Sequence, residues 1–275
     1  MEDIVSIIIP NYNSQQTITC TLQSIKRQTF KNYECVIIDD NSTDNSVEII
    51  EKIIKHDKRF KLIKSKISNG VAKTRNIGLS NSKGRYLTFI DADDIWDKNF
   101  ITKNLEIRKN KNIPISHSPY IRFKEINSRK IKGFQVNPPR IVNAKNILLK
   151  NYLPLLAIFI DRKIIGDIKF KDTRPEDYDL WIDLIKYNNN YSLSTSKVLC
   201  YYRISESQRS KNKLQAFIRI YSFYRRKLNL NKIHTFLYSL RWMYINILQR
   251  FTISKDIKSF NIPSELYELL NNKKN

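Results

Sequence analysis

Three groups of polar residues in the first hundred positions each follow an apolar run. The groups are Asn11 with Tyr12 and Asn13, Asp39 with Asp40, and Asp91 with Asp93 and Asp94. The carboxyl ends of parallel strands meet at one edge of a sheet, so we expect the three groups to converge on one crevice. Ordinary turn preferences explain any one group, but they explain all three together poorly.

The triplet Asp91-Ala92-Asp93 has the donor atoms of a divalent metal site. In an extended chain its two carboxylates would point to the same side, because side chains alternate with a period of two. Mg²⁺ or Mn²⁺ takes one or two carboxylates and completes its shell with water and phosphate oxygens. The triplet therefore predicts a metal that is shared with a bound diphosphate.

A second carboxylate pair, Glu176-Asp177, lies between Pro175 and an apolar-patterned helical segment. A carboxylate placed there would act as a general base on a substrate hydroxyl. It would equally stabilise the helix N-terminus, and on the residues alone this second interpretation is favoured. Both interpretations stay open at this point.

The elements that would position these groups alternate between strand and helix patterns. Apolar runs predict strands at 4–9, 36–38, 60–63 and 86–90, and helical faces lie between them at 18–25, 47–54 and 72–79. The pattern predicts an α/β fold with a mostly parallel, Rossmann-like sheet flanked by helices. With 275 residues, 41% of them hydrophobic, the chain is long enough for one sizeable core or a core with a smaller appendage.

Five segments resemble, in order and spacing, family 2 glycosyltransferases. They are VSIIIPNYN, VIIDDNSTDNS, NGVAKTRNIGL, YLTFIDADD and RPEDYDLWI, and the resemblance covers roughly residues 3 to 205. It implies a GT-A fold, a nucleotide-diphosphate sugar donor, Mn²⁺ or Mg²⁺, and inversion at the anomeric carbon. It further implies UDP-hexose or UDP-N-acetylhexosamine as the donor. The acceptor would be a glycan or glycolipid hydroxyl in surface-polysaccharide or lipo-oligosaccharide synthesis.

Members of the family that add sugars processively carry a QxxRW element, which is missing here, and no apolar run is long enough to span a membrane. We therefore expect the transfer of a single sugar. The donor-binding residues that the resemblance implies are Pro10, Tyr12, Asn13, Asp39, Asp40, Arg75, Asp91, Arg203 and Ser207. Asp40 would be the main uracil contact. Arg75 would lie near the diphosphate, and its alternative role is a surface salt bridge.

The same resemblance assigns roles to the acidic motifs. Asp93 would bind the metal directly, and Asp91 would contact the ribose or metal-bound water. Asp177 would be the base that deprotonates the acceptor, with Glu176 positioning the acceptor or that base. Both residues would thus be catalytic.

We expect a glycosyltransferase domain over 1–210, with a nucleotide-binding half at 1–110 and an acceptor-binding half at 111–210. A basic, aromatic, helical region would follow at 211–275, with helices at 214–228 and 233–251. These helices suit an anionic membrane surface, but their aromatic stripe equally suits packing on the catalytic domain. Residues after Lys255 are expected to fray.

The formal charge of +23 calls for an anionic partner such as a lipid surface, a phosphorylated substrate or nucleic acid. A basic nucleic-acid-binding protein is one alternative, but no known module appears and acidic strand ends would repel a polyanion, so no nucleic acid is expected. A sugar nucleotidyltransferase is another, but its glycine-rich opening loop is missing. The three cysteines show no paired spacing, so we expect a cytoplasmic protein. Because of its basic helices, we expect it to lie peripherally on the inner face of the membrane.

Overall fold

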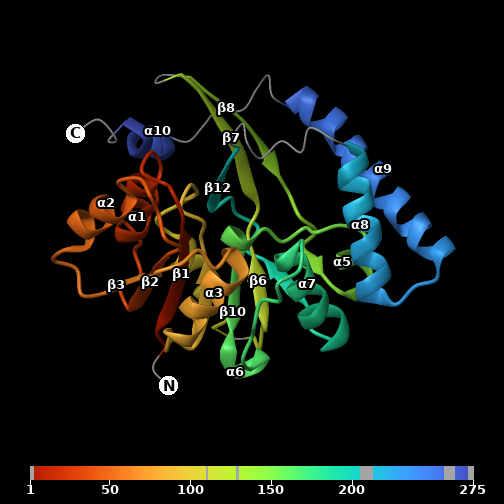
Figure 1. The fold of residues 1–275 in the computed structure, drawn as a ribbon, viewed down its shortest axis with the longest axis horizontal. Helices are drawn as coiled ribbons and strands as arrows, with labels where there is room; N and C mark the ends of the chain where they lie inside the picture. Colours follow the sequence, from red (N-terminus) through yellow and green to blue (C-terminus); the bar gives the residue numbers. More distant parts are fainter. Residues whose placement is uncertain (1–2, 110, 128–129, 205–212, 257–263, 272–275) are drawn as a thin grey trace.

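The computed structural model describes residues 3–109, 111–127, 130–204, 213–256 and 264–271. These residues form an eight-stranded sheet at the centre, a smaller four-stranded sheet at one end of it, and helices packed around both (Figure 1). The α/β class, the mostly parallel sheet and the helical C-terminal region predicted from the sequence are confirmed.

The large sheet has the strand order β3-β2-β1-β4-β10-β6-β11-β9. Its strands are β1 (Val5–Asn11), β2 (Tyr33–Asp39), β3 (Phe60–Lys64), β4 (Tyr86–Phe89), β6 (Ile115–His117), β9 (Ile141–Val142), β10 (Ile158–Asp161) and β11 (Ser192–Ser194). Strands β3, β2, β1 and β4 are parallel, whereas β10 runs antiparallel to both β4 and β6. The two halves of the chain thus share one sheet, which joins at β4 and β10.

The smaller sheet has the order β5-β12-β7-β8. It consists of β5 (Ile95–Trp96), β7 (Tyr120–Asn127), β8 (Lys130–Val136) and β12 (Cys200–Arg203). Strand β12 pairs in parallel with β7 and antiparallel with β5, which begins one residue after Asp94. This sheet therefore brings residues near 200 next to the acidic turn after β4.

Helices cover both faces of the large sheet. On one face α1 (Ile18–Lys26), α2 (Ser46–Ile54) and α4 (Phe100–Glu106) pack on alternate residues of β1 and β2. On the other face lie α3 (Val71–Ser80) and α7 (Glu176–Trp181), which continues as a π-helical segment to Tyr187. Short helical segments occur at α5 (Ala144–Ile147), η1 (Leu155–Ala157) and α6 (Arg162–Ile165). Strands buried on both faces explain the nearly continuous apolar runs in the sequence.

Two glycines set the position of α3. Gly70 precedes the helix with a φ of +78°, a conformation that other residues rarely adopt. A Cβ atom at Gly78 would collide with Ile8 and Ile38 of the sheet, so the helix lies closer to β1 and β2 than any larger residue allows. This close approach places Arg75, between the two glycines, over the carboxyl end of the sheet.

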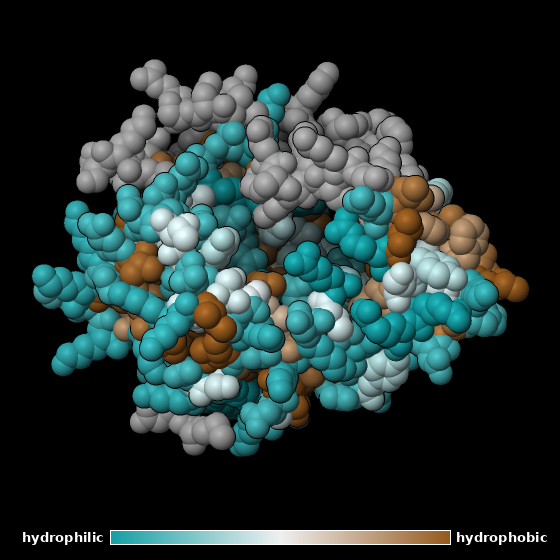
Figure 2. All heavy atoms as spheres, viewed as in Figure 1, coloured by the Kyte–Doolittle hydropathy of each residue, from teal (hydrophilic) through white to brown (hydrophobic). Residues whose placement is uncertain are grey.

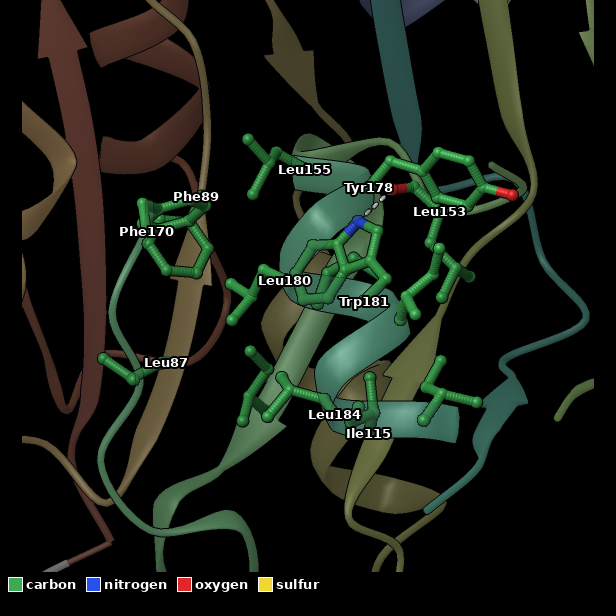
Figure 3. Packing of buried hydrophobic residues seen from close by; sticks show 14 of the residues in the cluster. Leu87, Phe89, Ile115, Leu153, Leu155, Phe170, Tyr178, Leu180, Trp181 and Leu184 are labelled. Carbon is green, nitrogen blue, oxygen red and sulfur yellow. Dashed lines mark hydrogen bonds between the residues drawn. The ribbon is translucent and has the colours of Figure 1, made fainter. Parts of the chain in front are cut away.

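The helix that carries the second acidic pair is held by large buried side chains (Figure 3). Trp181 is fully buried, and its indole nitrogen donates a hydrogen bond of 2.8 Å to the carbonyl oxygen of Leu153. Leu180 and Trp181 pack in the same cluster as Phe89 of β4 and Phe170. The start of α7 is therefore fixed relative to the sheet that carries the first acidic group.

The predicted C-terminal helices are present as α8 (Lys213–Leu228) and α9 (Lys232–Asp256). Helix α8 packs beside α7: Phe223 and Tyr224 are buried, and the Tyr224 hydroxyl lies 3.0 Å from that of Tyr178. Lys227 forms ion pairs with Asp179 at 2.9 Å and with Asp183 at 2.6 Å. Of the two alternatives for this region, packing on the rest of the protein is therefore observed for one face of α8.

The expectation that residues after Lys255 fray is wrong for α10 (Ser264–Asn271). Leu266 and Leu269 are buried beside α1, and Cys20 donates a hydrogen bond of 3.3 Å to the carbonyl oxygen of Leu269. The i, i+3 spacing of the two leucines gives a short apolar face, and that pattern was the available signal. The C-terminal region thus packs beside α7 through α8 and beside α1 through α10, on opposite sides of the molecule (Figure 1).

Candidate active site

The loops after β1 and β2 are joined by hydrogen bonds to the Asp39 carboxylate. Asn11 donates from its amide at 2.7 Å, and Ser42 donates from its hydroxyl at 2.6 Å and from its backbone N–H at 3.0 Å. Asp39 and Asn11 are buried. Asp39 is therefore engaged in holding the two strand ends together.

The neighbouring residues shape the rim of this end of the site. Asn13 has a φ of +47°, and its side-chain oxygen accepts a hydrogen bond of 2.8 Å from the backbone of Thr43. Tyr12 beside it is 58% exposed, and Pro10 lies within β1. An exposed ring on a fixed loop is a suitable surface for stacking a nucleotide base.

The residues at 42–44 contact both the loop after β1 and the start of α2. Helix α2 begins at Ser46, and its N-cap Asn45 makes no side-chain capping bond. The Asp44 carboxylate accepts hydrogen bonds of 3.0 Å from the backbone of Gln15 and of Ser46. The cluster therefore supports the loop that carries Tyr12.

Asp40 points to the opposite side of the same strand end. Its carboxylate accepts hydrogen bonds from the backbone of Asn69 at 2.7 Å and of Gly70 at 3.0 Å, and from the Ser68 hydroxyl at 3.0 Å. Burial raises the pKa of Asp40, but these donors outweigh it and hold the pKa below its ordinary value. Asp40 thus fixes the loop before α3, and its role as the main uracil contact stays a prediction.

The group after β4 forms a turn, which differs from the extended chain considered in the sequence analysis. The backbone N–H of Asp94 donates to the carbonyl of Asp91 at 3.1 Å. Burial and the charge of Asp91 raise the pKa of Asp93 to about 6, and burial with both neighbouring charges raises that of Asp94 well above its ordinary value. A turn crowds three carboxylates more closely than a strand would, so the group attracts cations.

Arg203 reaches this turn from β12. Its backbone N–H donates to the Asp94 carboxylate at 2.9 Å, and its side chain donates to the carbonyl of Asp93 at 2.8 Å and pairs with Glu125. Arg203 therefore contacts the acidic turn, and its contact with a phosphate stays a prediction. Ser207, the other predicted contact on this segment, lies outside the described residues.

Arg75 connects the two acidic motifs. Its guanidinium is 2.8 Å from the Asp91 carboxylate on one side and 2.8 Å from the Glu176 carboxylate on the other. Burial lowers the pKa of Arg75, but Asp91 and Glu176 more than compensate and raise it. The residue is 3% exposed, so the surface salt bridge considered in the sequence analysis is excluded.

Asp177 follows Glu176 in the first turn of α7. Its carboxylate accepts hydrogen bonds from the backbone of Tyr178 at 2.7 Å and from the side chain of Asn151 at 2.9 Å. Burial, followed by the charge of Glu176, raises its pKa to about 6. The N-cap position is taken by Pro175, so Asp177 is not the helix cap. A carboxylate with this pKa is suited to accept a proton near neutral pH.

The donor set at the acidic turn fits a divalent cation that shares its shell with a ligand. No other described residue donates a hydrogen bond to the Asp93 carboxylate, and the crowded negative charge would be relieved by a cation. Within the part of the chain that the structure describes, no three acidic, histidine or cysteine side chains converge as a complete metal site. One or two carboxylates open to phosphate oxygens are the arrangement that Mg²⁺ and Mn²⁺ commonly use.

Sequence reasoning missed two residues that support the predicted ones. Asn11 was recognised only as a strand-end residue, although it hydrogen-bonds to Asp39. Asn151 carried no signal, because it contacts Asp177 across 26 positions and lies in an irregular segment. Only the three-dimensional fold brings Asn151 to α7.

Comparisons with known proteins agree with this geometry. Residues 6–159 match the family described as Glycosyl transferase family 2. WfgD of Escherichia coli, a UDP-Glc:alpha-D-GlcNAc-diphosphoundecaprenol beta-1,3-glucosyltransferase, is 34% identical over 218 residues, which are 78% of this chain and 83% of WfgD.

Two solved structures share the fold. TarS 1–349 of S. aureus in complex with UDP-GlcNAc has a TM-score of 0.65 at 22% identity, covering 87% of this chain and 71% of that one. The mannosyltransferase PcManGT of Pyrobaculum calidifontis in complex with GDP-Man and Mn²⁺ has a TM-score of 0.60 at 12% identity, covering 98% and 83%. The expected GT-A fold is confirmed. Because the family match spans more than half of the sequence and a relative of similar length is 34% identical, the chain belongs to glycosyl transferase family 2.

Proposed function

We propose that this glycosyltransferase moves one sugar from a UDP-linked donor to an acceptor hydroxyl with inversion at the anomeric carbon. The observation that carries the proposal is the Arg75 bridge between Asp91 and Glu176. It places the acidic turn, which suits a metal and a diphosphate, beside Asp177, which suits a proton acceptor. A direct displacement needs both groups on opposite sides of one reacting carbon.

On the acceptor side, Asp177 takes the proton of the attacking hydroxyl. Asn151 holds one of its carboxylate oxygens, and Glu176 is held by Arg75, so the base has a fixed direction. Fixing a base within hydrogen-bond reach of the nucleophile contributes typically about 10²- to 10⁴-fold to a rate. Glu176 is a positioning residue in this scheme.

On the donor side, Asp93 and Asp91 would hold Mn²⁺ or Mg²⁺. When bound, the metal neutralises the charge that develops on the departing diphosphate. Tyr12 stacks on the base, Asp40 and the loop at residues 68–70 surround it, and Pro10, Asn13 and Asp39 fix the ribose end. Arg203 holds the turn from the far side. The Mn²⁺ in the PcManGT complex and the UDP-GlcNAc in the TarS complex support a divalent metal and a UDP-linked donor.

The name of WfgD supports UDP-glucose as the first donor to test and a lipid-linked glycan as the acceptor class. A panel of UDP-hexoses and UDP-N-acetylhexosamines, with GDP-mannose as a control, should show donor hydrolysis and transfer for one UDP sugar in the presence of Mn²⁺. The product anomer, read by NMR, should be opposite to that of the donor. Retention of configuration, or activity only with a GDP sugar, would contradict the proposal.

We infer that the enzyme works at an anionic membrane surface. Helices α8 and α9 expose an apolar face over the right flank of the molecule (Figure 2). Its residues are Leu214, Ile218, Ile233, Phe236, Leu237 and Tyr244. The sequence from 207 to 255 contains no acidic residue, and the exposed Arg225, Arg226 and Arg241 accompany the apolar face. Amphipathic basic helices of this kind lie in the headgroup region of anionic bilayers.

No helix of the described residues is long and apolar enough to cross a membrane, so the contact would be peripheral. Vesicle flotation tests it: Ile233→Ser with Leu237→Ser should reduce binding to phosphatidylglycerol vesicles. Ile141→Ser, at an exposed isoleucine on β9, is the matched control. Equal binding to neutral vesicles, or no loss in the double variant, would count against a membrane role.

A further inference from the structure

The end of α8, where the chain turns into α9 (Figure 1), borders a hollow of about 440 Å³. Asn229 has a φ of +50°, the left-handed conformation that commonly ends a helix. The hollow is lined by Tyr221, Ser222, Arg225, Arg226, Asn229 and Leu230. Every polar side chain in this lining can donate a hydrogen bond, and none of them is a carboxylate. The lining is therefore suited to an anion.

Arg225 and Arg226 are the charged residues of this lining, and both are exposed. Among the residues that the structure describes, no carboxylate pairs with either guanidinium. The acidic residues that pack against α8, Asp179 and Asp183, pair with Lys227 instead, at 2.9 Å and 2.6 Å. Neither α8 nor the turn after it contains an acidic residue. Two guanidinium groups on one hollow repel each other, and an anion bound between them would replace that repulsion with attraction.

An exposed apolar strip of α8 leads to this hollow. Leu214, Ile218, Tyr221 and Arg225 follow one another at intervals of three and four residues, so they lie along one face of the helix. Leu214 is 65% exposed and Ile218 is 53% exposed. A ligand that lies along this face would meet apolar side chains first and guanidinium groups at its end. A phospholipid has the same order of groups, with acyl chains at one end and a phosphate at the other, whereas a free anion would use only the basic end.

We propose that this hollow binds the phosphate group of an anionic phospholipid, with Arg225 and Arg226 on the phosphate oxygens and Ile218 against the acyl chains. A planar guanidinium group can donate to two phosphate oxygens at once, and Ser222 and Asn229 supply neutral donors. The inference rests on the proposed membrane contact for the lipid as the source of the phosphate, whereas the anion site itself does not. It goes beyond that contact, because a bilayer attracted by charge alone would not distinguish these two arginines from other exposed cations nearby.

Dihexanoyl phosphatidic acid below its critical micelle concentration tests the site without a bilayer. Calorimetry on the full chain should show at least about tenfold weaker binding for Arg225→Gln and for Arg226→Gln, since each variant loses a charge-assisted contact. Arg241→Gln removes the same charge at an exposed arginine of α9 outside the lining, and it should bind like wild type. Wild-type binding in both lining variants, or an equal loss in Arg241→Gln, would overturn the proposal.

A second measurement assigns the phosphate to a lipid. Ile218→Ser should weaken the binding of dihexanoyl phosphatidic acid and leave the weaker binding of inorganic phosphate unchanged, because only the lipid reaches the apolar strip. If inorganic phosphate binds wild type as tightly as the lipid does, the hollow is a site for free phosphate and the lipid assignment is wrong.

Vesicle flotation separates this site from the general membrane contact. With vesicles of phosphatidylcholine and phosphatidylglycerol, Arg225→Gln with Arg226→Gln should lose more binding than Lys232→Gln with Arg241→Gln, which removes the same two charges from exposed positions of α9. An equal loss in the two double variants would overturn the site and keep the proposed membrane contact. If wild type does not float with these vesicles, the membrane contact fails, and calorimetry with the soluble lipid alone supports or overturns the site.

Discussion

The two groups of carboxylates near the carboxyl edge of the large sheet differ in the hydrogen-bond donors and the charges that surround them. Asp39 and Asp40, after β2, accept hydrogen bonds from backbone and side-chain donors of the neighbouring loops. Asp93, Asp94 and Asp177 are partly or fully buried among like charges, and their pKa values are raised. Asp40 is stabilised in its charged form, whereas the second group is not.

This difference indicates that carboxylates at one edge of the sheet have two kinds of role, one in fixing loops and one in the reaction. A carboxylate with many hydrogen-bond donors fixes the loops that shape the proposed nucleotide site. A carboxylate that lacks enough donors gains from a cation or a proton that arrives with the substrate. We therefore expect substitutions in the second group to affect turnover and metal binding, and substitutions in the first to affect stability and nucleotide binding.

The largest expected effect is that of Asp177→Asn. The change keeps the size of the side chain and abolishes proton acceptance, so transfer should fall by about 10² to 10⁴ while donor binding persists. The rate of transfer to an acceptor with verified turnover is the measurement, and Glu106→Gln, at an exposed carboxylate, is the control. Transfer within a few-fold of wild type would falsify the assignment of the base and return Asp177 to a structural role.

The next effect concerns the metal. Asp93→Asn should weaken UDP binding in the presence of Mn²⁺ by at least about tenfold, because one charged ligand is lost. In EDTA the variant and wild type should bind UDP alike, and calorimetry can compare the two conditions. If chelation leaves wild-type UDP affinity unchanged, the two carboxylate groups do not differ in the way described.

The pH dependence of transfer sharpens the comparison further. A base with a pKa of about 6 must lose its proton to act, so the rate should rise by about tenfold between pH 5 and pH 7. The Asn151 hydrogen bond lowers the pKa of Asp177, so Asn151→Ala should move this rise to higher pH. If the rate of Asn151→Ala rises at the same pH as the wild-type rate, or at a lower pH, the ionisation of Asp177 does not determine the pH dependence of transfer.

The smallest effects distinguish the groups by stability. Asp40→Asn should destabilise the fold by about 1 to 2 kcal/mol, because an amide nitrogen cannot accept the donors that a carboxylate oxygen accepts. Asp94→Asn keeps an acceptor for the Arg203 N–H and removes a crowded charge, so it should be neutral or stabilising at pH 7. Urea unfolding midpoints measure the stability of both variants. If Asp94→Asn is destabilised more than Asp40→Asn, the two carboxylate groups do not differ in the way described. The pKa of Asp40 is lower in the folded protein than in the unfolded chain. Asp40 therefore stabilises the fold at pH values above its unfolded pKa, and this contribution is lost as the pH falls through its folded pKa.

The sequence predicted the strands, the helices of the first half and the placement of three polar groups at one edge of the sheet, since periodicity and strand-end position are local signals. It did not predict that the acidic triplet forms a turn, because Asp-Ala-Asp is compatible with either conformation. The Arg75 bridge joins residues 101 positions apart, and the contact of Asn151 with α7 is equally remote. Pairings of that kind depend on how the two halves share one sheet, which no single segment encodes.

The packing of the C-terminal region on α7 and on α1 limits what can be learned from truncated forms of this enzyme. Helix α8 shares buried aromatic side chains with the helix that begins at Glu176, and α10 covers α1 at the other end. A truncation at residue 210 would therefore remove part of the interior of the catalytic domain along with any surface-binding element. Exchange of this region between relatives would also replace side chains that pack against the helix carrying Glu176 and Asp177. Point substitutions on the exposed face of α8 and α9 are therefore the informative way to study membrane binding.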